Sequence, residues 1–229
     1  MGYRYETHLH TSEGSACARA SGAEQVRSYY EAGYTGIIVT DHFFNGNTTV
    51  PRNLPWKERV NLFCLGYENA KAEGDRLGMD VFFGWESGYS GTDFLIYGLD
   101  KQWLIEHEGM LEWSVEEQYH RVKADGGLIV HAHPFRQAFY IPEVRLFPEY
   151  VDAVEVINMG NVPLDPIYNN QAYAYALEHD LPMTSGSDIH NVPASSGGME
   201  FGHRLTCIED YMSAVMAREG KVLGLEMVQ

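Results

Sequence analysis

Two histidines separated by a single residue, His8 and His10, lie near the start of the chain in the sequence YETHLHTSEGS. Side chains two positions apart in a β-strand point to the same side, so both imidazoles would face one point in space. Paired imidazoles of this kind are suited to binding a transition-metal ion. A surface strand can also carry two histidines by chance, so the rest of the chain must decide between these readings.

Other histidines and acids follow apolar segments elsewhere in the chain. Six of the ten histidines lie at the carboxyl end of a strand-like segment, namely His8, His10, His42, His131, His133 and His190. Three acids lie at similar ends, namely Asp41, Glu86 and Asp188. In a parallel α/β barrel the carboxyl ends of all strands open on one face. We therefore expect these side chains to meet at a single site.

The chemistry of this set indicates a metal centre. Imidazole and carboxylate together suit Zn, Mn or Fe, whereas an all-oxygen set would suit Mg or Ca. The candidates are too numerous for one tetrahedral ion, so we expect two or three divalent ions. Such ions would lower the pKa of bound water and stabilise the charge of an in-line attack on a phosphate ester.

The elements that must position these residues alternate between apolar strand-like segments and helical segments, which predicts an α/β fold. Strands are expected at 3–10, 35–42, 79–86, 92–100, 127–134, 152–158 and 181–190, with a further short strand around 204–208. Helices are expected at 22–34, 56–77, 114–127, 165–180 and 209–220. Ser21 and Ser114 are predicted N-caps. No repeat or linker divides the sequence, so we expect one domain over residues 1–229.

Composition narrows the range of partners. Acids outnumber bases 32 to 16, which gives a formal net charge of −16. This field argues against binding of long nucleic acid and favours a small phosphorylated substrate. The apolar runs are shorter than the ~20 residues of a membrane span, and no signal-peptide pattern opens the chain, so we expect a cytoplasmic protein without a membrane partner. The oligomeric state is not indicated.

The cysteines are few and widely spaced. Cys17, Cys64 and Cys207 form no CxxC motif. This spacing predicts neither a disulfide framework nor a thiolate zinc site. Neither Cys17 nor Cys207 has a base at a recognisable spacing, so nucleophilic cysteine chemistry is not expected.

Six motifs in a fixed order resemble the PHP (polymerase and histidinol phosphatase) superfamily. They extend from about residue 5 to residue 206 and comprise HxH at His8 and His10, TDH at Asp41 and His42, GWE at Glu86, HAHP at His133, EVIN at Glu155 to Asn158, and GSDIH at Asp188 and His190. The resemblance implies a distorted (β/α)7 barrel with the metal site at the carboxyl face of its strands. It also implies a phosphoesterase with up to three metal ions.

The resemblance also implies a ligand set for each ion. The first ion would be bound by His8, His10, Glu86 and Asp188, the second by Glu86 and His133, and the third by His42 and His190. Glu86 would thus bridge two ions.

Two positions depart from the family pattern. Members usually have an acid or a histidine where this chain has Ser15, and many have a histidine where it has Leu95. We expect Glu13 to supply the first ligand through a shortened loop. Asp93 or His131 are the alternatives for the second.

Three further residues are expected to take part in catalysis. Arg136, just after the HAHP motif, is suited to holding a phosphate with two parallel hydrogen bonds. Asp41 is placed to orient an imidazole or to donate a proton. Asp41 or His131 would protonate the leaving alkoxide.

These observations predict hydrolysis of a small phosphate monoester or phosphodiester by a metal-activated hydroxide. Histidinol phosphate, a nucleotide and an oligonucleotide end are all compatible with the sequence. Two alternatives remain: an amidohydrolase-type enzyme that cleaves a C–N bond, and a degenerate PHP module that binds metal without catalysis.

Overall fold

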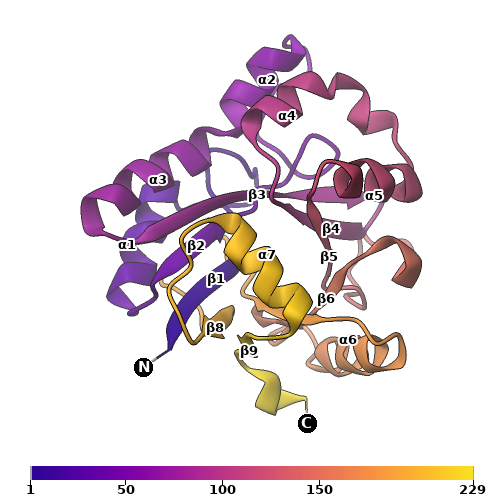
Figure 1. Cartoon of the computed structure of the whole chain (residues 1–229). Coiled ribbons are helices and arrows are strands. Elements are labelled where there is room, and N and C mark those ends of the chain that lie inside the picture. The colour runs from indigo at the N-terminus through magenta and orange to yellow at the C-terminus, as the bar shows by residue number, and fades with distance from the viewer. Residues whose placement is uncertain (1, 229) are drawn as a thin grey trace.

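The computed structural model describes residues 2–228 of the chain. Their strands form one strongly curved, nearly closed sheet with helices around it (Figure 1). In spatial order the strands are β7 (Met183–Gly186), β6 (Ala153–Asn158), β5 (Leu128–Ala132), β4 (Thr92–Tyr97), β3 (Asp80–Tyr89), β2 (Gly36–Val39), β1 (Tyr3–Leu9), β8 (Met199–Phe201) and β9 (Lys221–Val222). The predicted distorted α/β barrel is confirmed, although nine strands are present where seven were expected.

Hydrogen bonds between the end of β1 and the segment after β7 bring the two sides of the sheet together. The Asp188 amide donates to the His8 carbonyl over 2.7 Å, and the His10 amide donates to the Ile189 carbonyl over 2.9 Å. The first and last predicted metal motifs are thereby neighbours.

Six strands run in one direction. β1, β2 and β3 pair in parallel, as do β5, β6 and β7. β4 is antiparallel to both of its neighbours. It follows β3 through a two-residue turn in which Ser90 and Gly91 have φ angles of 51° and 89°, a short hairpin connection that forces reversal. The carboxyl ends of the six remaining strands therefore share one face.

The two extra strands belong to the carboxyl-terminal part of the chain. The short strand expected around 204–208 is not present, because β8 ends at Phe201 and residues 204–207 form the loop before α7. β8 pairs antiparallel with β1, and β9 pairs antiparallel with β8. They extend the sheet at its β1 edge and do not contribute a parallel strand to the barrel.

The helices are α1 (Gly22–Glu31), α2 (Trp56–Phe63), α3 (Leu65–Leu77), α4 (Lys101–Glu106), α5 (Val115–Ala124), α6 (Ile167–Glu178) and α7 (Ile208–Ala217). The predicted helix at 56–77 is two helices that meet at Cys64. Ser21 and Ser114 form capping boxes with Glu24 and Glu117, which confirms both predicted N-caps.

The interior of the sheet is apolar at the end opposite the carboxyl face. There α7 packs Tyr211 against Tyr97 and Phe201, with ring centroids 5.1 and 6.2 Å apart. Figure 1 shows α7 lying across the strands at this end. The polar side chains are thus concentrated at the other end. In residues 2–228 no helix has the length and apolar character needed to cross a bilayer.

Candidate metal centre

An irregularity in β1 lies next to the HxH motif. Between Glu6 and Leu9 the register with β2 shifts by one residue, as in a β-bulge. The buried carboxylate of Glu6 accepts the amide protons of Thr7 and His8 at 2.9 and 2.8 Å, and also that of Ser187 at 2.9 Å. Burial raises the pKa of Glu6. This acid therefore fixes the bulge that carries His8.

Five buried side chains converge at the carboxyl face, and we call them the inner group: His8, His10, Glu86, His133 and Asp188. His10 Nε2 lies 3.1 Å from Asp188 Oδ1, and His8 Nε2 lies 3.5 Å from both Asp188 Oδ1 and Glu86 Oε1. His133 Nε2 lies 3.1 Å from Glu86 Oε1. Four segments far apart in sequence thus supply one compact set of donor atoms.

Hydrogen bonds orient the two imidazoles of the HxH motif. His8 Nδ1 lies 2.8 Å from Glu155 Oε1, so it carries the proton that this carboxylate accepts. His10 Nδ1 lies 3.0 Å from Ser15 Oγ, and the Ser15 hydroxyl donates to Asp41 Oδ1 over 2.7 Å. Ser15 therefore accepts from His10. Both imidazoles present Nε2, and these two atoms are 3.2 Å apart.

This pair of nitrogen atoms fits a bound cation. Two neutral imidazoles whose Nε2 lone pairs face each other at this distance repel unless a proton or a metal ion lies between them. Ligand atoms about 2.1 Å from one ion lie about 3.0–3.4 Å from each other. The separations of 3.1, 3.2 and 3.5 Å among His8, His10 and Asp188 match such a set. The residues present therefore fit a divalent metal ion.

Charges around the inner group favour ionised carboxylates. Burial would raise the pKa of Glu86, but His42 and His133 hold it well below its usual value. Burial would lower the pKa of His8, but the carboxylates of Glu155 and Asp188 raise it well above its usual value. Without metal, a proton on His8 can therefore fill the place between the two Nε2 atoms.

Arg136 supports the inner group from one side. Its guanidinium donates to Asp188 Oδ2 over 2.6 Å, to Asn158 Oδ1 over 2.7 Å and to Asn161 Oδ1 over 2.7 Å. Glu155 joins the same network, since its Oε2 accepts from Asn158 Nδ2 over 2.8 Å. These contacts fix Arg136 while leaving it on the wall of the cavity described below.

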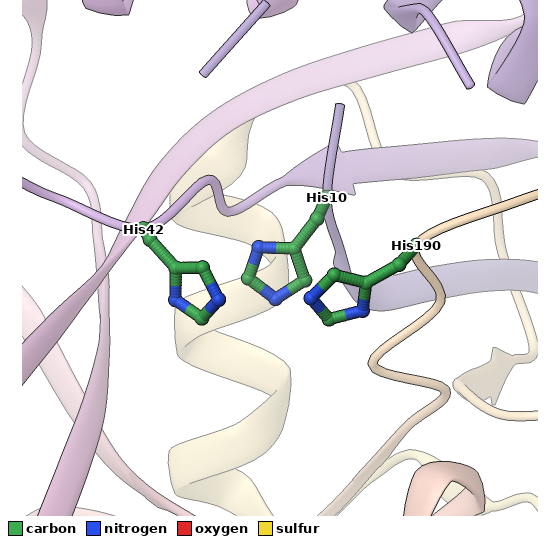
Figure 2. A group of neighbouring side chains, drawn as sticks. All are labelled: His10, His42 and His190. Carbon is green, nitrogen blue, oxygen red and sulfur yellow. The ribbon is translucent and has the colours of Figure 1, made fainter. Parts of the chain in front are cut away.

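A second set of side chains lies closer to solvent, and we call it the rim group: Cys17, His42 and His190. The side chains of His42 and His190 are 20% and 29% exposed, whereas those of His8 and His10 are fully buried. Figure 2 shows His10 between His42 and His190, with ring centroids 4.2 Å away on each side. Ligand atoms of these three histidines lie within 4.8 Å of one another.

Asp41 reaches this cluster only through Ser15. Its carboxylate also accepts the amide and hydroxyl protons of Thr11 at 2.7 and 2.6 Å. Burial raises its pKa to about 6. Of the two predicted roles for Asp41, the contacts favour orientation of the His10 imidazole, because both carboxylate oxygens are engaged behind it.

A cavity of about 510 Å³ opens above both groups. Its wall includes His42, Glu86, Asp93, His133, Arg136 and Tyr140. Burial, together with the charge of Glu86, raises the pKa of Asp93 to about 6. Asp93 pairs with Ala132 across the sheet, which places its carboxyl at the open end of β4, beside His133. Leu95 lies further down the same strand, opposite Glu86.

Glu13 does not reach the metal centre, which corrects the prediction that it replaces the ligand missing at Ser15. Its carboxylate accepts the Gly22 amide proton at the start of α1 over 3.1 Å, and it also accepts from Asn69 Nδ2 over 3.0 Å. A carboxylate is stabilised at a helix N-terminus by the free amides and the helix dipole. The remaining seven predicted ligands are brought together.

His131 also lies outside the site, which corrects its predicted roles as proton donor and replacement ligand. It is fully buried, stacked on Phe94 with centroids 5.1 Å apart, and neither ring nitrogen has a hydrogen-bond partner. Burial lowers its pKa to about 3. His133 lies two residues later but points to the opposite side of the sheet, because its φ of 29° interrupts the alternation of the strand.

The sequence alone did not reveal the roles of three contributors to the site. Glu6 was hidden as an acid inside a strand-like segment, and Glu155, although part of the EVIN motif, was given no role. Cys17 was set aside because no base lies near it in sequence. Its thiol instead meets the imidazoles of His42 and His190, which hold its pKa at about 6 against the effect of burial.

Comparison with known proteins shows similarity in structure only. No family model and no curated protein matches the chain. A two-domain Bacteroides vulgatus protein containing a predicted PHP-like metal-dependent phosphoesterase superposes with a TM-score of 0.63 and 15% identity over 96% of this chain. The chain has a PHP-like fold. It spans 64% of that two-domain protein.

Two further solved structures share the fold over nearly their whole length. A candidate metal-dependent phosphoesterase from Bifidobacterium adolescentis has a TM-score of 0.58 and 16% identity, with 93% of this chain and 96% of that one covered. An amidohydrolase from Chromobacterium violaceum, with bound sulfate and no metal, has a TM-score of 0.59 and 16% identity, with 95% and 97% covered. At these identities the similarity describes the fold, and it supports the PHP resemblance of the sequence motifs.

Proposed function

We propose that this protein is a metal-dependent hydrolase that cleaves a small phosphate monoester or phosphodiester. The observation that carries the proposal is the pair of Nε2 atoms of His8 and His10, 3.2 Å apart and both turned toward Asp188. Nothing in a purely structural role requires two imidazoles to be fixed with their lone pairs facing each other. The cavity above them gives a substrate access to this point.

The chain would hold the metal ions with the residues already described. His8, His10, Glu86, His133 and Asp188 would bind at the inner group, and His42 and His190 would bind at the rim. Bound divalent ions supply hydroxide at neutral pH and stabilise charge on phosphoryl oxygens. This donor set of imidazole and carboxylate suits Zn, Mn or Fe.

Other residues would act on the substrate directly. Arg136 presents a fixed positive charge on the cavity wall, where a phosphate oxygen would be neutralised. Asp93 faces the same cavity with a pKa of about 6, so it would be partly protonated near neutral pH. We propose that Asp93 donates the proton to the leaving oxygen, in the place expected for His131 or Asp41.

The substrate is proposed to be small. A cavity of about 510 Å³ is of the size that binds metabolites and nucleotides. The net charge of −16 opposes a long polyanion, whereas bound metal ions together with Arg136 would attract a single phosphate group. Histidinol-phosphate-like esters, nucleotides and oligonucleotide ends are therefore the substrates to screen.

Hydrolysis of a C–N bond is the second candidate, because one protein of this fold is named as an amidohydrolase. Many barrel amidohydrolases bridge two metal ions with a carboxylated lysine. Among the residues that the structure describes, no lysine lies on the cavity wall. The donor set thus favours the phosphoesterase.

The proposal is tested with protein reloaded with Mn, Zn or Fe and assayed on p-nitrophenyl phosphate, a nucleotide panel and an amide panel. We expect phosphoester cleavage that is abolished in His8→Ala and in Asp188→Ala. His120→Ala, a change at an exposed histidine of α5, should retain full activity. Phosphoester activity that survives both inner-group changes would overturn the assignment. Fewer than two ions per chain without any turnover would favour a non-catalytic module.

A further inference from the structure

The segment 137–146, which follows β5 and the HAHP motif, forms no helix or strand, and we call it the strap. It carries two adjacent aromatic residues, Phe139 and Tyr140. Phe139 is fully exposed, and Tyr140 is 57% exposed. Tyr140 lines the cavity above the metal centre, as does Arg136 just before the strap, whereas Phe139 is not on the cavity wall. Two neighbouring aromatic side chains therefore differ in their access to the cavity.

Contacts with the turn between β3 and β4 fix the position of the strap. Ile141 lies so close to this turn that a Cβ atom added to Gly91 would be 3.0 Å from the Ile141 Cα atom. Further along the strap, the Arg145 guanidinium donates to the Tyr89 carbonyl. Because Tyr140 directly precedes Ile141, these contacts place it at a defined position on the cavity wall.

Tyr140 differs in kind from the other residues of the wall. Apart from the inner group, the rim group, Arg136 and Asp93, the wall is uncharged and consists of Asn45, Asn47, Ser90, three glycines and Tyr140. Within residues 2–228, no Val, Leu, Ile, Phe or Trp side chain lines this cavity. A leaving group above the metal centre would therefore meet amide groups, backbone and one phenol ring, but no aliphatic surface.

The ring of Tyr140 is available to a ligand. The Phe139 ring meets it at an interplanar angle of 90°, with centroids 5.3 Å apart. This edge-to-face contact covers at most one face of the Tyr140 ring. An exposed ring on a cavity wall is removed from water only when a ligand covers it. Pairs of aromatic rings gain more free energy than their buried area alone provides, so a planar ring is the group that uses this surface best.

We propose that Tyr140 determines substrate specificity by stacking on a planar, uncharged ring in the leaving group of the phosphate ester. The phosphate would lie against Arg136 and the metal centre, and the ring would lie against the strap. Esters of ring-bearing alcohols, such as nucleoside phosphates, would thus be preferred over sugar phosphates and glycerol phosphate. The inference rests on the proposed function and names the substrate class of the same site.

Two phosphonates that differ only in the ring test this proposal. In adenosine 5′-phosphonate and ribose 5-phosphonate, carbon replaces the ester oxygen, so neither compound is hydrolysed. Calorimetric titration of the Mn-loaded full chain measures the affinity of each. We expect the wild type to bind the adenosine compound about 5- to 100-fold more tightly, which is the range for a base stacked on an aromatic side chain.

Variants of the two aromatic residues separate stacking from a structural role. Tyr140→Ala should remove the preference for the adenosine compound without changing the affinity for the ribose compound. Tyr140→Phe, which keeps the ring, should retain the preference. Phe139→Ala is the matched control, because it removes the adjacent ring that is not on the cavity wall, and it should also retain the preference.

Three results would overturn the proposal. The first is equal affinity of the wild type for the two phosphonates, and the second is an equal loss of affinity for both in Tyr140→Ala. The third is failure of the wild type to bind either compound. Turnover of p-nitrophenyl phosphate is measured separately, so a hydrolase without this preference is distinguished from a protein that is not a phosphoesterase.

Discussion

The inner group and the rim group lie side by side but are built differently. In the inner group, His8 is held by Glu155, Asp188 is held by Arg136, and the side chains are almost fully removed from solvent. In the rim group, His42 and His190 are partly exposed and Cys17 is exposed. Two carboxylates belong to the inner group and none to the rim.

This difference indicates separate tasks for the two groups. Buried ligands with buried hydrogen-bond partners are preorganised, so metal binding costs little conformational entropy. Substitution of exposed ligands on loops has less effect on the stability of the fold. Under the proposed function, the inner group would therefore hold its ion more firmly than the rim group.

The largest effect is expected from removing the support behind the inner group. Glu155→Gln loses the carboxylate that accepts from His8 Nδ1, so the imidazole is no longer held in one orientation and tautomer. We expect metal binding about 10- to 100-fold weaker. Calorimetric titration with Mn or Zn measures it. Glu149→Gln, the same change at an exposed site, is the matched control; an equal loss in both variants would contradict the role of Glu155.

A smaller effect should distinguish the two groups by their affinity. The ligands of the inner group are buried, whereas the rim histidines are partly exposed and share only Glu86, which contacts His42, so a chelator should remove the rim ion first. We expect at least a tenfold difference in affinity, which corresponds to about 1.4 kcal/mol. Ions per chain are counted during stepwise chelation. In His42→Ala the first step should disappear while the second remains. If the chelator removes all ions in a single step, the inner group and the rim group do not differ in metal affinity.

The smallest effect on the site is expected for His131→Phe, although this residue is two positions from His133. Burial lowers the pKa of His131 to about 3 in the folded protein, whereas a histidine of the unfolded chain has a pKa of about 6.5. As the pH falls below about 6.5, the unfolded chain therefore binds a proton that the folded protein does not bind. Stability from the neutral form is therefore lost as pH falls. Between pH 7 and pH 5 the wild type should lose about 2 kcal/mol more than the variant.

Urea unfolding at the two pH values measures this difference, and metal content and turnover at pH 7 should equal those of the wild type. A loss of turnover in His131→Phe would show that His131 contributes to the site.

Local patterns predicted much of the fold and of the inner group. The alternation at His8 and His10 and the capping residues Ser21 and Ser114 depend on neighbours within a few positions, and each is found as expected. Side chains at the carboxyl ends of separate strands also lie together, as expected, because the carboxyl ends of parallel strands open on one face.

The failures have non-local causes. Glu13 is engaged by the start of α1 and by Asn69, neither of which its own motif reveals. His131 and His133 lie on opposite sides of the sheet because of one positive φ. Cys17 depends on partners at residues 42 and 190. Sequence spacing cannot show contacts that only the closed sheet creates.

Anomalous diffraction from crystals loaded with Mn tests the central claim most directly. We predict a peak between Nε2 of His8 and Nε2 of His10, within about 2.3 Å of both atoms and next to Asp188. Binding there would show that the two facing nitrogens are metal ligands. Crystals in which Mn binds elsewhere, or in which the two Nε2 atoms enclose no peak at saturating Mn, would contradict the metal centre described for this protein.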